Sequence, residues 1–220
     1  MSELYGYTVP YEHFLKDVRP WAPDVPEFVA VHAIRNACIE FCEKTNYVQQ
    51  NIVPISGQMN VATYQISTPD GTRFLDAIEM YYNENLLIPK SVDELAVIYR
   101  SYEWDTIGGN PAYVTRIIEP EIQLVPFPVS YLSNAITGRI SLAPTRDSCE
   151  IEHRVWEHYA ETIAHGALAR LYAMPDQPYS NPKAAEEFRR RFVAECGSAR
   201  RKVEKGLGRA DVRMQFQGWV

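Results

Sequence analysis

Apolar side chains at both ends of the chain recur every three or four positions, which is the spacing of one face of an α-helix. Such a stripe predicts a helix over residues 26–44, after the proline-rich stretch RPWAPDVP. Two further stripes predict helices over 150–174 and 182–205, joined by the turn MPDQPYSNP, and a short helix is expected over 8–18. The stripes consist of Phe28, Val31, Ile34, Cys38, Phe41 and Cys42, then Val155, Tyr159, Thr162, Ile163, Gly166, Leu168, Ala169 and Tyr172, then Ala185, Phe188, Phe192 and Cys196.

From Tyr47 onward the period of the apolar positions changes to two, which is typical of half-buried β-strands. The expected strands lie in YVQQNIVPI, NVATYQI, FLDAIEMYY, LLIP, GGNPAYVTRI, EIQLVPFP and AITGRISLAP. A short helix is expected from Ser91 to Arg100, because Ser91 and Glu94 have the S-x-x-E spacing of a capping box.

Helices therefore open and close the chain and strands fill its middle, an order that favours the α+β class. We expect a helical bundle formed by the N-terminal and C-terminal helices, from residues 1–46 and 147–206. A central β-rich insertion is expected over 47–146. Gly206 and Gly208 end the last helical pattern, so residues 207–220 are expected to form an extended C-terminal arm.

The charges are unevenly distributed over the 220 residues, whose net charge is −6. The segment from Glu187 to Arg213 holds nine basic and four acidic residues, a net charge of +5 that leaves −11 for the remainder. Such asymmetry suggests a basic C-terminal part that meets an acidic partner. A solvated helix face whose long arginine stems cover apolar surface is the other interpretation.

The sequence shows no signal peptide and no apolar run long enough for a membrane span, so we expect a protein of a reducing cytoplasm with no membrane partner. Its four cysteines form no C-x-x-C motif and are expected to be buried free thiols. No cofactor is expected.

The densest group of titratable residues lies in EIEHRVWEHYAETIAH. Glu150 and His153 have an E-x-x-H spacing, and His153, Glu157 and Glu161 share one helix face, as metal ligands on a bundle helix would. A di-iron site needs a second such motif on another helix, and neither 26–44 nor 182–205 offers one. We therefore expect no metal site and no catalytic residue, although a metal-dependent enzyme using this cluster stays open as an alternative.

The basic residues between Arg189 and Arg213 raise a second alternative, a nucleic-acid-binding protein. The chain as a whole is acidic, and it contains no recognisable nucleic-acid-binding module. These arginines could equally contact an acidic protein.

Four segments, taken in their order along the chain, resemble the head-to-tail adaptor (head-tail connector, or tail tubular A-like) proteins of tailed bacteriophages. They are FLKDVRPWAPDVPEFVAVHAIRNACIEFCEKT, LLIPKSVDELAVIYR, NPAYVTRI with IQLVPFP, and HGALARLYAMPDQPYSNPKAAEEFRRRF. The resemblance implies a structural virion protein that forms a homo-oligomeric ring, commonly twelvefold, at the junction of portal and tail. Its partners would be the portal protein, a tail or nozzle protein, and further copies of itself.

The resemblance also implies that GLGRADVRMQFQGWV reaches the portal. The residues expected to form this portal-binding arm are Arg209, Val212, Arg213, Met214, Phe216, Trp219 and Val220. The basic helix is expected to contribute contacts through Arg189, Arg190, Arg200 and Arg201. DNA would pass through the ring without specific binding. An acidic body suits that role, because a basic channel lining would bind DNA through counterion release.

Overall fold

The computed structural model describes residues 7–101, 103–116 and 120–205. Within these ranges the helices are η1 (Tyr11–Phe14), α1 (Leu15–Val18), α2 (Glu27–Thr45), α3 (Val92–Tyr99), η2 (Trp104–Thr106), α4 (His153–Tyr172) and α5 (Pro182–Lys205). The strands are β1 (Thr8–Pro10), β2 (Gln49–Asn51), β3 (Ile55–Gly57), β4 (Thr63–Gln65), β5 (Thr72–Tyr82), β6 (Asn85–Leu86), β7 (Ile88–Pro89), β8 (Gly108–Gly109), β9 (Tyr113–Arg116), β10 (Glu121–Val125), β11 (Phe127–Pro128), β12 (Leu132–Pro144) and β13 (Glu150–Glu152). None of the described helices is both long and apolar enough to cross a membrane.

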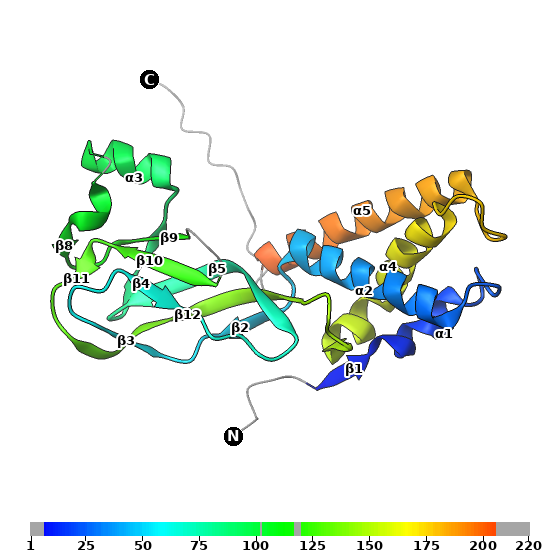
Figure 1. The fold of residues 1–220 in the computed structure, drawn as a ribbon, viewed down its shortest axis with the longest axis horizontal. Coiled ribbons are helices and arrows are strands. Elements are labelled where there is room, and N and C mark those ends of the chain that lie inside the picture. Colours follow the sequence, from blue (N-terminus) through cyan, green and yellow to red (C-terminus); the bar gives the residue numbers. More distant parts are fainter. Residues whose placement is uncertain (1–6, 102, 117–119, 206–220) are drawn as a thin grey trace.

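The β-rich half of the molecule is built around two sheets (Figure 1). The larger sheet has the order β2-β12-β5-β6, and β3 also pairs with β12; the other has the order β4-β10-β9-β7. Phe74 and Ile140 of the larger sheet are buried in one cluster with Ile122 and Val114 of the other. The alternation of apolar positions thus places one face of each sheet in a shared core.

A short helix, α3, stands at the end of this β-rich half (Figure 1). Ser91 caps it by accepting a hydrogen bond from the backbone N–H of Glu94, and the Glu94 side chain accepts one from the backbone N–H of Ser91. The predicted capping box is therefore confirmed. Leu95 anchors α3 in a small cluster with Trp104 and Val125.

The other half of the molecule is a layer of three helices, α2, α4 and α5, which lie side by side (Figure 1). Small residues allow close packing: a Cβ atom added to Gly166 of α4 would lie 2.8 Å from the ring of Phe192 on α5 and 3.0 Å from Ala37 on α2. The first predicted stripe is wrong at Phe28, which is 76% exposed. Alanines, including Ala33 and Ala37, fill the interface of α2 instead, and their apolar signal is weaker than that of a large side chain.

The two halves are joined by strand pairs as well as by chain connections. The long ribbon of β5 and β12 extends from the sheets to the helical layer, where Ala143 joins the helical core. Val48 packs against both the helical core and the sheet core.

The predicted architecture, a helical bundle with a central β-rich insertion, is wrong. The described chain is a mixed α+β protein whose thirteen strands form several sheets, and strands also belong to the helical half. There β1 pairs antiparallel with β13, with Val9 opposite Ile151, where helix starts were expected. A three-residue strand has no measurable period, so only the tertiary pairing reveals it. The division into units at 1–46 with 147–206 and at 47–146 stays a prediction.

Candidate assembly surface

The basic helix α5 packs one side into the helical layer and exposes the other. Its buried residues recur at helical spacing and are Ala185, Phe188, Phe192, Cys196 and Ala199. Phe192 is fully buried against α2 and α4. The arginines lie away from this stripe, so the helix keeps its basic side chains at or near the surface.

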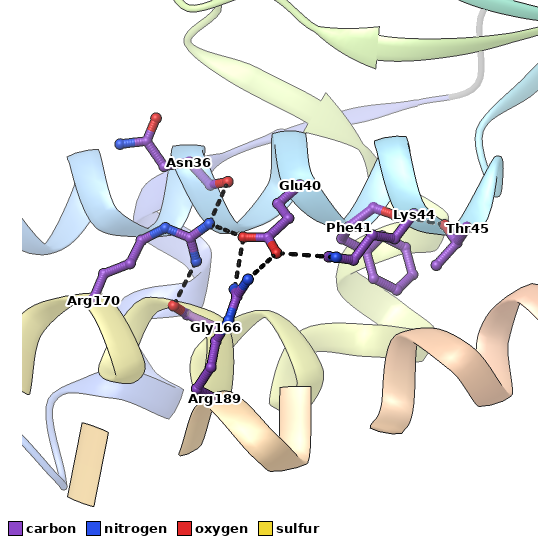
Figure 2. Close-up of polar contacts among 8 residues, drawn as sticks. All are labelled: Asn36, Glu40, Phe41, Lys44, Thr45, Gly166, Arg170 and Arg189. Carbon is purple, nitrogen blue, oxygen red and sulfur yellow. Dashed lines mark hydrogen bonds and ion pairs between the residues drawn. The ribbon is translucent and has the colours of Figure 1, made fainter. Parts of the chain in front are cut away.

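Arg189 is engaged within the protein by Glu40 of α2. Its guanidinium lies 2.7 and 2.8 Å from the two carboxylate oxygens of Glu40. Arg170 of α4 also binds this carboxylate, and Lys44 lies 3.5 Å from it (Figure 2). A second Arg170 nitrogen donates to the backbone oxygen of Gly166 at 2.7 Å. Glu40 therefore ties α2, α4 and α5 together through charged hydrogen bonds.

The environment of Glu40 favours its ionised form. Burial alone would raise the pKa of this carboxyl, but hydrogen bonds and positive charge from Arg189 and Arg170 outweigh burial and lower the pKa of Glu40. Arg189, predicted as a contact to a partner, thus has a structural partner in its own chain.

The other predicted arginines of α5 are more exposed. Arg190 forms an ion pair with Glu187, and Arg200 donates to Glu204 at 2.8 Å. Arg201 is exposed and has no ion-pair partner among the residues that the structure describes. These three arginines point away from the helical core. On the exposed surface, ion pairs with neighbouring acids contribute little stability, so the arginines stay available to a partner. The seven predicted arm residues, Arg209, Val212, Arg213, Met214, Phe216, Trp219 and Val220, lie outside the described residues.

The His–Glu cluster of α4 does not assemble into a metal centre in the described part of the chain, where no group of three or more His, Cys, Asp or Glu residues has metal-binding geometry. His153 Nδ1 lies 3.4 Å from Glu157 Oε2, as an i,i+4 pair on the helix surface. An open groove of about 970 Å³ is lined by β1, β2, β13 and the turn at 67–72. His153, Glu157 and Glu161 are not among its lining residues.

His165 is a buried polar residue of the helical layer that the sequence pattern did not single out. It is buried between α4 and α5, and its Nδ1 lies 3.1 Å from Glu195 of α5. Its ring centroid is 5.6 Å from that of Phe188. The sequence could have indicated that His165 is buried, because it precedes Gly166 and falls on the packed stripe of that helix. This histidine contributes to the packing of α4 on α5.

The sequence of this chain matches the model of a known protein family. The family model of the SU10 adaptor protein matches residues 10–215 of this chain. No curated protein matches the chain. The matched region includes both the helical layer and the two sheets.

Proposed function

Because the chain belongs to the SU10 adaptor protein family, a family of phage head-to-tail adaptors, we propose that it forms the ring that joins the portal to the tail. The observation that carries the proposal is the extent of the family match, over residues 10–215. Members of such a family are structural proteins of the virion and interact with other head or tail proteins. The portal at the capsid vertex is the partner on the head side, and a tail or nozzle protein is the partner on the other side.

The ring is homo-oligomeric and, in this proposal, twelvefold. A closed ring needs head-to-tail contacts, so each subunit carries two different complementary surfaces. The separation of a −11 body from a +5 segment between Glu187 and Arg213 supports such complementarity.

The portal is bound by the arm, residues 207–220. Five sizeable apolar residues occupy its last nine positions: Val212, Met214, Phe216, Trp219 and Val220. Their alternation at 212, 214 and 216 suits a strand added to the edge of a partner's sheet.

DNA passes through the ring without specific binding. An acidic or neutral lining supports passage, because each cation that contacts a phosphate strengthens binding through counterion release. The pairing of Arg189 with the half-buried Glu40 reduces the number of unpaired cations on α5, which disfavours the nucleic-acid-binding alternative.

Electron microscopy of the purified protein with its portal tests the proposal. We expect the free protein to sediment mainly as a monomer at low concentration, and to form rings that cap one end of the portal when the two are mixed. Portal particles without an added ring, at saturating protein, would contradict the proposed function. A stable closed ring without portal would contradict the expected dependence of assembly on the portal.

A further inference from the structure

The outward side of α5 is a helix face that nothing in the described protomer covers. Arg190, Val193, Ala194, Gly197 and Arg201 follow one another along it at helical spacing. Val193 is 44% exposed, although the stripe on the opposite side of α5 is buried. The centre of this face is therefore small and apolar, and an arginine stands at each end, Arg190 in an ion pair with Glu187 and Arg201 exposed.

Gly197 is unexplained by packing within the protomer. A glycine inside a helix costs about 0.5–1 kcal/mol relative to alanine. At Gly166 the neighbouring ring of Phe192 explains why a glycine is needed, because the ring leaves no room for a Cβ atom. At Gly197 the atom nearest to an added Cβ is Nη1 of Arg201, at 3.7 Å, at the end of a flexible side chain. The missing side chain gives room for close approach from outside the protomer.

The helix α3 presents a second uncovered face, with the opposite charge. Val97 is 76% exposed, and Val92 and Ile98 are also exposed, while Leu95 is buried beneath them. The exposed carboxylates around α3 belong to Asp93, Glu94, Glu103 and Asp105. Of these, the Glu94 carboxylate already accepts hydrogen bonds from Lys90 and from the backbone N–H of Ser91 at the start of α3. The exposed Arg100 caps the C-terminal end of α3 and Lys90 precedes the helix, so the four acidic and two basic residues give this surround a net charge of −2. The outer side of α3 is thus apolar with a surround that is acidic on balance.

The two faces lie on different halves of the protomer, α3 at the far end of the β-rich half and α5 in the helical half (Figure 1). Their contact therefore requires two copies. We propose that α3 of one copy packs across the outward face of α5 of the next copy, with Val97 over Gly197 and the acidic surround of α3 facing Arg190 and Arg201. This inference rests on the proposed ring and names the surfaces through which it closes.

The contact is heterologous, since a different surface is used on each copy, and repetition of the same contact generates a ring or a chain. The acidic surround of α3 and the basic ends of the α5 face are complementary in charge, which favours another copy of this chain as the partner of each face. It also suppresses contacts of α3 with α3 or of α5 with α5, because like charges would then meet.

Cysteine cross-linking on portal-bound rings tests the contact. Cys149 is the exposed native cysteine of the described chain, so Cys149→Ser provides the background; Cys38, Cys42 and Cys196 are buried. Val97→Cys and Val193→Cys are added together, and a short bismaleimide is the probe. Both sites are exposed, and a thermal melt of each variant verifies its fold. We expect a ladder of covalent oligomers that extends beyond the dimer.

Two controls make the result specific. Val53→Cys combined with Val193→Cys uses a site that is 60% exposed and lies on neither face, and it should give no ladder. An equal mixture of the Val97→Cys and Val193→Cys single variants should give dimers only, because each protomer then carries one reactive site.

A charge exchange provides an independent measurement. Arg201→Glu should weaken the co-assembly of copies on the portal at least tenfold at low salt, and Asp93→Arg in the same chain should restore most of the loss. Rings that form normally on the portal while the Val97–Val193 ladder is absent would overturn this contact and leave the adaptor function intact. Failure of the wild-type protein to form rings on the portal would overturn the proposed function together with the contact.

Discussion

The carboxylate of Glu40 on α2 accepts a hydrogen bond from Arg189 on α5 at 2.8 Å. Arg170 binds the same carboxylate from α4, so one half-buried acid holds two arginines from different helices (Figure 2). Part of the positive charge of α5 therefore stabilises the fold rather than a partner.

Replacing Glu40 with glutamine should destabilise the helical layer. The variant keeps the size of the side chain but leaves Arg170 and Arg189 without their counter-charge, and hydrogen bonds to charged groups are worth about 1.5–3 kcal/mol each before relaxation. We expect a loss of about 1–3 kcal/mol in the free energy of unfolding, measured by urea denaturation. Glu187→Gln is the matched control, because Glu187 also binds two arginines, Arg190 and Arg191, but on the exposed surface of α5. Equal losses in the two variants would contradict a special role for Glu40.

The contribution of Glu40 to the free energy of unfolding should depend on pH. Its pKa is lower in the folded protein than in the unfolded chain, so the charged form stabilises the folded state. That stability is present above the ordinary carboxyl pKa, near 4.3, and is lost as the pH falls through the lowered pKa. The difference in unfolding free energy between wild type and Glu40→Gln should therefore be constant from about pH 6 to 8 and shrink below about pH 4. A difference that does not change on acidification would argue against the charged interaction.

Gly166 and Gly197 should respond in opposite directions to alanine. At Gly166 a Cβ atom would lie 2.8 Å from the fully buried ring of Phe192, so Gly166→Ala should destabilise the protein by about 1–3 kcal/mol through overpacking. At Gly197 the space is open, so Gly197→Ala should stabilise the isolated chain by about 0.5–1 kcal/mol through helix propensity. Thermal melts of the two variants provide the measurement. A stabilising Gly166→Ala would show that the helices are less closely packed than the structure indicates.

Replacing both His153 and Glu157 with alanine should have a small effect. The two side chains form a surface i,i+4 pair with 3.4 Å between Nδ1 and Oε2, and such pairs contribute about 1 kcal/mol or less. We expect an unfolding free energy within about 1 kcal/mol of wild type and unchanged assembly on the portal. Elemental analysis of both proteins supplies the decisive comparison: stoichiometric iron or zinc in the wild type, lost in the variant, would favour the enzyme alternative.

Removal of residues 207–220 should leave the body folded and prevent docking to the portal. Cys196 and Ala199 are the most C-terminal residues of α5 that are buried in the helical core within the described part of the chain. Fourteen extended residues can span about 46 Å, enough to reach a neighbouring protein. Co-sedimentation with portal rings and circular dichroism measure binding and folding separately.

Single substitutions within the arm refine this test. Phe216→Ala and Trp219→Ala should each weaken portal binding by about 2 kcal/mol or more, because buried aromatic side chains dominate interface energies. Arg209→Ala and Arg213→Ala are the controls and should change mainly the salt dependence. Undiminished capping by the truncated protein would rule out the arm as the portal-binding segment, whereas its unfolding would place the arm in the core.

The positions of the long helices and of most strands follow from the sequence. The predicted ranges 26–44 and 182–205 agree closely with α2 and α5, because apolar residues that recur at helical spacing over about three or four turns are a strong local signal. The capping box at Ser91 and Glu94 is also local, since its two hydrogen bonds join residues three positions apart. The order of packing motifs along the chain identified the family of phage head-to-tail adaptors, which the family match confirms.

The tertiary structure alone decided which residues meet across the fold. The pairing of β1 with β13 and the binding of Arg189 and Arg170 to Glu40 join segments more than a hundred positions apart, and neither leaves a periodic pattern. The two glycines of the helical layer look alike in sequence, yet one is closed by Phe192 and the other is open. Local spacing determines which face of an element is apolar. The partner that covers that face depends on the packing of the whole chain, and this is why the predicted bundle was wrong although its long helices agree closely with the predicted ranges.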